Sequence, residues 1–281
     1  METKTENKVK ILFEVVGIAL LYLFIQLAVT IAFTLVIMLT VSTADKGAVL
    51  NKATELQPVM VLISNLIITI VFGIWYYLGY VRKNKLEGTY EPWQKKICDA
   101  KSIAFIVITT LAIGLLDGQI ADFVVRITHG GGDLYSQIAS VFHEVTLMNI
   151  ISMVLLAPMA TAFAFSGIIF QKMKKSFGMA GCIIIPAILL AISMLNPVQM
   201  IYGIPLDLFM MFVSYKYNSV LPGMLVMIIN NAGATILGAI FSNGVPPAVG
   251  VFIVVFFVLS IFLYRKLPLY RDTKDIHTHN E

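Results

Sequence analysis

The sequence predicts an all-α membrane protein: one polytopic bundle of about eight transmembrane helices, with both termini on the cytoplasmic side. Of its 281 residues, 58% are hydrophobic, and the mean hydropathy is +0.87. Charged residues make up only 13% of the chain, whereas a soluble domain carries about 25%. Apolar runs near the length of about 20 residues that crosses a bilayer recur from end to end. Such a chain can bury its apolar surface only in lipid, and its small net charge of +4 gives no reason to expect nucleic acid as a partner.

Eight segments are apolar enough to be considered as spans, although the third, fifth and sixth are short. The first follows the polar N-terminus and contains roughly 30 apolar residues, whereas the core of a signal peptide has about 7–15. It is therefore expected to be a retained span. The eight segments are residues 11–41, 57–81, 102–116, 146–171, 179–195, 198–215, 220–241 and 246–264.

The distribution of Lys and Arg supports eight spans, because basic residues collect in cytoplasmic loops. With the N-terminus inside, only Lys46, Lys52 and Arg126 of the 20 basic residues fall on the outer side. Seven or nine spans would scatter the other 17. The outer connection 119–145 mixes polar and apolar residues around glycines, and we expect it to form two short interfacial amphipathic pieces.

The segment 157–231 resembles a known family. It contains "APMA" followed by "SGIIF", then "KKSFG", "MLNPVQMIYG" and "SVLPGMLVMIINN". In this order and at these spacings, the segment is similar to the CAAX-protease and bacteriocin-processing (CPBP) membrane proteins, also called type II CAAX endopeptidases or the Abi family. The resemblance implies a family-like core over 146–242 within one transmembrane domain, 1–270. Residues 271–281 are expected to form a polar tail.

The resemblance also implies three intramembrane motifs: a Glu pair with an Arg four residues later, a Phe with a His four residues later, and a His with an Asn or Asp four residues later. Residues four apart share a helix face, so each motif directs its polar groups into one cavity. In that cavity the Glu can take a proton from water, while the other groups hold the water or the oxyanion.

This chain departs from all three motifs. The Glu pair falls on Thr161 and Ala162, and the Arg falls on Ser166. The remaining positions fall on residues that are apolar except for the last: Leu190, Met194, Met227 and Asn231. Because a missing general base alone costs about 10²–10⁴ in rate, no catalytic residue is expected at these positions. Ordinary helix packing, a retained binding pocket and proteolysis by substitute residues all remain open.

Asp207 is the informative polar residue within a span, since an intramembrane carboxylate costs about 2.5–3.5 kcal/mol on insertion scales and suggests function. No Lys or Arg lies at a comparable depth. Asn196, Asn230 and Asn231 are its expected polar partners, because the family resemblance implies that these helices lie together. Two interpretations stay open: a protonated Asp207 that locks two helices together, and a carboxylate that binds a proton or a ligand.

The sequence therefore predicts a catalytically inactive homologue that acts as a binding partner, immunity factor or scaffold. The alternatives are an active intramembrane endopeptidase using Asp207 with Asn231 and Thr161, and a small-molecule or ion carrier. We expect no metal and no cofactor. The expected partners are the lipid bilayer and another membrane or envelope protein or a peptide, and the expected location is the cell membrane, as the resemblance implies that of a bacterium.

Overall fold

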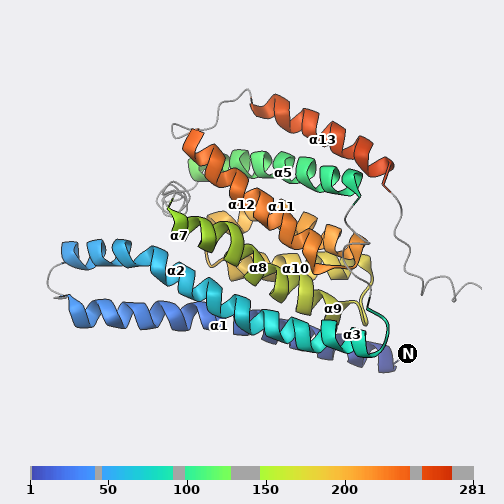
Figure 1. The fold of residues 1–281 in the computed structure, drawn as a ribbon, viewed down its shortest axis with the longest axis horizontal. Helices are drawn as coiled ribbons and strands as arrows, with labels where there is room; N and C mark the ends of the chain where they lie inside the picture. The colour runs from blue at the N-terminus through green and yellow to red at the C-terminus, as the bar shows by residue number, and fades with distance from the viewer. Residues whose placement is uncertain (1, 42–45, 91–98, 128–145, 241–248, 268–281) are drawn as a thin grey trace, which may run out of the picture.

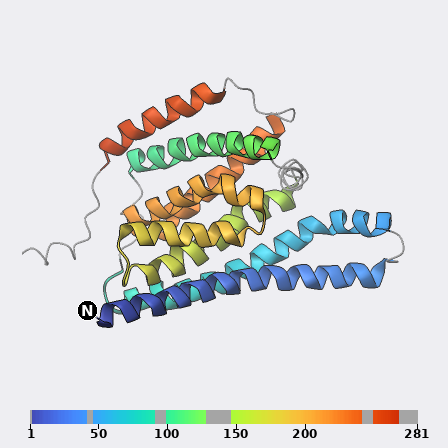
Figure 2. The ribbon, with the colours of Figure 1, turned by 180° about the vertical axis from the view of Figure 1, so that it is seen from behind.

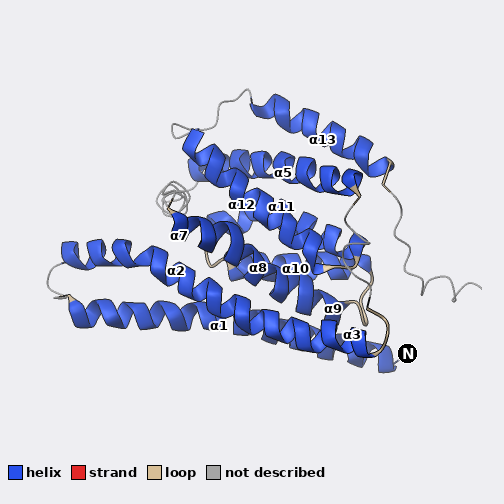
Figure 3. Cartoon of the chain, viewed as in Figure 1, coloured by secondary structure: helices blue, strands red, loops and turns tan. Residues whose placement is uncertain are grey.

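The computed structural model describes residues 2–41, 46–90, 99–127, 146–240 and 249–267. Within these ranges the chain is helical and contains no strand (Figure 3), which confirms the predicted all-α class. Among the described residues, five helices are long and apolar enough to cross a membrane, and three shorter apolar stretches accompany them: Met179–Ser193, Val220–Ile236 and Val249–Arg265. The predicted tail 271–281 lies outside the described residues.

Eight helical segments make up the described chain. Some are interrupted by π-helical turns, which are named η. In chain order the elements are α1 (Glu2–Thr40); α2 (Lys46–Tyr76) with η1 (Tyr77–Arg82) and α3 (Lys83–Leu86); α5 (Ala100–Ile127); α7 (Leu147–Asn149) with η2 (Ile150–Leu156), α8 (Ala157–Thr161), η3 (Ala162–Ile169) and α9 (Phe170–Met173); α10 (Met179–Ser193); α11 (Pro197–Tyr217); α12 (Val220–Ile240); and α13 (Val249–Arg265).

The helices stack side by side. The long hairpin of α1 and α2 forms one edge of the bundle, and α13 packs on α5 at the other edge (Figures 1 and 2). The segment α7–α9 lies between them, in contact with α2 and α12, while α11 contacts α5, α10 and α12. The largest buried side chains belong mostly to these inner helices and include Phe165, Phe170, Met210 and Met211. The core therefore sits around the segment that resembles the protease family.

The third span is longer than predicted. Helix α5 continues to Ile127, so residues 119–127 are part of a transmembrane-length helix and the prediction of interfacial pieces is wrong for them. Residues 128–145 lie outside the described chain. The predicted span stopped at residue 116, just before Asp117, but the bundle buries Asp117 and the helix continues past it.

Basic residues gather at one end of the bundle. The Lys8 ammonium lies over the Phe177 ring, 5.9 Å from its centroid, and Lys174 donates to Asn218 at 2.7 Å. The Lys216 ammonium lies 4.1 Å from the centroid of the Tyr264 ring. These contacts bring the start of α1, the end of α9 and the ends of α11 and α13 together, as the eight-span arrangement requires. Which side of the membrane this end faces stays a prediction.

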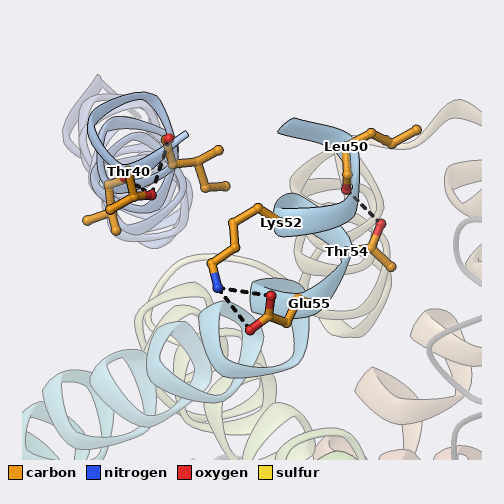
Figure 4. A network of polar contacts seen from close by, with 7 residues as sticks. Thr40, Leu50, Lys52, Thr54 and Glu55 are labelled. Atoms are coloured by element: carbon orange, nitrogen blue, oxygen red, sulfur yellow. Dashed lines mark hydrogen bonds and ion pairs between the residues drawn. The ribbon is translucent and has the colours of Figure 1, made fainter. Parts of the chain in front are cut away.

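The opposite end of the α1–α2 hairpin is polar. Both carboxylate oxygens of Glu55 accept from Lys52 at 2.9 Å, and the Thr54 hydroxyl donates to the Leu50 carbonyl at 3.0 Å (Figure 4). In α1, Thr40 donates to the Val36 carbonyl at 2.8 Å. Helix α2 therefore begins at Lys46, well before the predicted start at residue 57, because these polar residues satisfy one another within an exposed helical turn.

Small residues allow the inner helices to approach closely. A Cβ built on Gly223 of α12 would lie 2.4 Å from Ser214 Oγ of α11 and 2.9 Å from Ser166 Oγ of η3. Glycine and serine at such contacts are typical of membrane helix packing. Three helices therefore meet at Gly223, and nothing larger than hydrogen fits on its Cα without a shift of its neighbours.

We predict that Gly223→Ala destabilises the protein by about 1–3 kcal/mol, the usual cost of overpacking a close contact. The matched control is Gly203→Ala in α11, where an added Cβ meets no atom within 4 Å. Unfolding of both variants in mixed detergent measures the difference. Equal stability of the two variants would contradict the close three-helix contact.

Candidate functional site

The helical segment 147–173 carries the positions of the first family motif, and its backbone is irregular. Two π-helical stretches, η2 and η3, flank the short α8. Pro158 accounts for the first, because proline has no N–H and its ring clashes with the carbonyl four residues earlier. The Ala157 N–H bonds to the Ser152 carbonyl, five residues back. The Met153 carbonyl therefore loses the donor of Ala157, and its next partner in a π-turn would be Pro158, which has no hydrogen to give.

Side chains from α2 and α12 bind the carbonyls of this irregular stretch. Asn231 Nδ2 donates to the Met153 carbonyl at 2.7 Å. From α2, Asn65 donates to the Ser152 carbonyl at 3.4 Å and to Ser152 Oγ at 3.3 Å. Thr69 donates to the Leu156 carbonyl at 3.1 Å. Irregular backbone inside a membrane is tolerated only where such groups are satisfied, so the amide of Asn231 has a structural task.

Thr161 and Ala162, at the positions of the Glu pair, are both buried. The Thr161 hydroxyl lies 3.4 Å from the Tyr22 hydroxyl of α1. Ala162 packs with Val220 and Met224 of α12. The first Glu position is therefore occupied by a neutral hydroxyl group that lies close to a second one, and the second Glu position by a small apolar side chain.

Ser166, at the position of the Arg, is completely buried. Its hydroxyl donates to the Ala162 carbonyl at 3.0 Å, and it belongs to the close contact around Gly223. An arginine side chain has no room at this position unless α12 moves away.

The positions of the two His motifs lie in apolar surroundings. Leu190 of α10 and Met227 of α12 belong to the buried core, and Met194 packs against it half-buried. None of these three side chains accepts or releases a proton. Methionine fills irregular gaps between helices, which is the role that this packing gives it.

Asp207 does lie in the interior, and a second carboxyl group accompanies it. Asp207 of α11 is 2% exposed and Asp117 of α5 is 5% exposed. The two helices that carry these residues, α5 and α11, pack against each other. Asp117 Oδ1 is buried without a hydrogen-bond partner among the described residues. The interior therefore holds two carboxyl groups on neighbouring helices, the acidic pair Asp117 and Asp207, and not the single carboxylate that the sequence predicts.

The asparagines predicted as partners of Asp207 lie in different surroundings. Asn196 is the N-cap of α11, and its Oδ1 accepts from the backbone of Val198 at 3.0 Å and of Gln199 at 3.1 Å. It lies 11 residues before Asp207, about 16 Å along a helix, so the prediction that it is a partner is wrong. Asn230 instead faces α5: a Cβ built on Gly114, one turn before Asp117, would meet Asn230 Oδ1 at 2.8 Å.

The described residues contain no group of three His, Cys, Asp or Glu side chains that could hold a metal ion. The acidic pair alone supplies too few ligands for the usual sites. The expectation of no metal and no cofactor stays a prediction.

The positions of the first and third motifs thus lie on α8, η3 and α12, which pack against one another, while those of the second motif lie at the C-terminal end of α10. A model of the Rce1-like type II CAAX prenyl endopeptidases matches residues 143–233. The chain carries an Rce1-like region. The match covers about a third of the chain and confirms the resemblance inferred from residues 157–231. No curated protein and no solved structure matches the chain.

The Rce1-like region includes the irregular helix, α10, α11 and the first two-thirds of α12, but its polar surroundings come from elsewhere. Tyr22 lies in α1, Asn65 and Thr69 in α2, and Asp117 in α5, and none of these four was expected from the sequence. Asp117 had a readable signal, because it follows an apolar run and stands three residues after Gly114. The other three had none, since single polar residues in a span do not reveal which backbone group they bind.

We predict that Asn231→Leu destabilises the protein by about 1–3 kcal/mol, because it leaves the partly buried Met153 carbonyl without its side-chain donor. Pro158→Ala restores an N–H to the same stretch, so in that background the cost of Asn231→Leu should fall, with a coupling of about 1 kcal/mol. Unfolding of the two single variants and the double variant in mixed detergent measures this coupling.

Pro186→Ala is the matched control, because Pro186 lies inside α10 and not in the segment that Asn231 contacts. The pair Pro186→Ala and Asn231→Leu should be additive. If Pro158→Ala leaves the effect of Asn231→Leu unchanged, Asn231 does not compensate for the backbone hydrogen bond that Pro158 removes.

Proposed function

We propose that the protein is an Rce1-like, multi-pass membrane protein that has lost peptide hydrolysis and acts by binding. Its partner is another membrane or envelope protein or a peptide, which it would serve as an immunity factor, a regulator or a scaffold. One observation carries the proposal: the positions that correspond to the family's Glu, Arg and His residues are filled by groups that pack and do not exchange protons.

The packing at Ser166 and Met227 supports the loss of hydrolysis. Ser166 lies in the contact of three helices around Gly223, and Met227 is part of the apolar core. Asn231 matches the family pattern, but its amide is engaged by the Met153 carbonyl. A group already committed to the backbone is a poor candidate for holding water or an oxyanion.

A second candidate function is proteolysis by the acidic pair, and the burial of both carboxyl groups on two helices that pack together, α5 and α11, is the observation that favours it. Two neighbouring carboxyl groups can share one proton, as in the aspartic proteases. The ionised member would take a proton from water as the water attacks the peptide carbonyl. The protonated member would give its proton to the carbonyl oxygen, and the amine would leave with a proton when the intermediate collapses.

The two candidates are separated by a cleavage assay. The full chain, purified and reconstituted in nanodiscs, is incubated with a prenylated CAAX peptide and with apolar peptides that span a membrane, and the products are identified by mass spectrometry. We expect no cleavage above that of empty nanodiscs. Asp117→Asn and Asp207→Asn are tested in parallel, since each keeps the shape of the side chain and removes its ability to ionise.

Cleavage by the wild-type protein that either substitution lowers by about 10²-fold or more would overturn the binding proposal and establish the acidic pair as catalytic. Cleavage that neither substitution affects would overturn both candidates, because it would require other residues.

A further inference from the structure

A shallow groove opens on the surface of the bundle between α1, α2 and α9, away from the acidic pair. It has a volume of about 240 Å³ and is lined by Glu14, Gly17, Ile18, Trp75 and Lys172. A Cβ built on Gly17 meets no atom within 4 Å, so the glycine leaves the middle of the groove open. The Trp75 ring is held at the wall by stacking on Phe72, with 6.1 Å between the ring centroids.

The groove lies at the basic end of the bundle, and its charge is unbalanced. Lys172 donates to Glu14 across it. Lys10 stands one helical turn before Glu14 in α1, and Lys175 follows Lys172 by three residues just beyond α9, so further ammonium groups lie near the ion pair. A local excess of positive charge remains after the ion pair has formed.

These features fit one kind of occupant. Apolar walls beside a tryptophan suit a molecule lying at the membrane interface, where tryptophan prefers to be. Basic pockets between transmembrane helices on the cytoplasmic side bind anionic lipid headgroups. Lysines near the surface reach the phosphate level while their stems cover apolar side chains.

We infer that the groove between Glu14, Gly17, Trp75 and Lys172 binds an anionic phospholipid, with the phosphate at Lys172 and the start of an acyl chain over Gly17 and against Trp75. The inference is independent of the proposed function, since it uses no residue of the interior site.

The inference is tested by quenching of Trp75 fluorescence. The chain has two tryptophans, Trp75 and Trp93, so Trp93→Phe leaves Trp75 as the only emitter. This variant is reconstituted in phosphatidylcholine vesicles that contain increasing fractions of brominated phosphatidylglycerol or of brominated phosphatidylcholine. We expect the anionic lipid to quench at a mole fraction about fivefold lower, the order of effect that one lysine has near an anionic headgroup.

Charge substitutions separate a lipid site from a structural ion pair. Lys172→Gln and Glu14→Gln both break the contact between Lys172 and Glu14, so a purely structural role predicts the same change for both. A phosphate site predicts opposite changes: Lys172→Gln lowers the preference for phosphatidylglycerol, and Glu14→Gln raises it.

Gly17→Leu tests the groove without any change of charge. It should fill the open space and reduce the preference to about that of bulk lipid. The matched control, Gly250→Leu, also adds a side chain to a glycine with open space around it, but on α13, and should leave the preference unchanged. Equal quenching by the two lipids, parallel changes in the two charge variants, or an unaltered preference in Gly17→Leu would each overturn the inference.

Discussion

The structure depends on the need to satisfy the backbone of one broken helix inside the membrane. Pro158 removes a donor from the segment 147–173, and the helix loosens into π-turns around it. In lipid no water replaces the missing donor. Asn65 and Thr69 from α2 and Asn231 from α12 therefore bind the carbonyls, and these bonds fix where the two helices lie. Asn231 stands at the position of a family motif, and its hydrogen bond to the Met153 carbonyl gives it a structural role there.

The same arrangement determines what the interior can do. Helix α12 lies beside Met153 at Asn231 and beside Ser166 at Gly223, so it closes against the irregular helix along most of its length. Along this contact, the motif positions that hold Glu, Arg and His in the family carry small or apolar side chains, which neither bind water strongly nor transfer a proton. The exception is the pair Asp117 and Asp207, which belongs to α5 and α11. Within the described interior, this acidic pair is the feature that supports the second candidate function, proteolysis.

The sequence was a good guide to the helices and a poor guide to the polar contacts between them. Apolar length predicted all eight helical segments, because insertion into lipid depends on local composition. Asp117 ended a predicted span too early, since a carboxylate followed by mixed residues is typical of a loop unless another helix buries it. Asn196 was predicted beside Asp207 because the family resemblance brings these segments together, but in the structure it caps the N-terminus of α11. Neither the burial of Asp117 and Asp207 on two packed helices nor the bond from Asn231 to Met153 could be predicted, because each depends on segments far apart in the chain.

The central claim is that the interior around the motif positions is closed to water. It is tested most directly by the reactivity of a cysteine placed at Met227 in a chain with Cys98→Ser and Cys182→Ala, using a membrane-impermeant thiol reagent on both sides of the bilayer. A cysteine at Lys52, which lies in the polar end of the α1–α2 hairpin, serves as the reactive reference. The account predicts that the cysteine at 227 stays unlabelled in the folded protein and reacts only after unfolding. Rapid labelling in the folded protein, comparable to that at position 52, would reveal a water-filled cavity and contradict it.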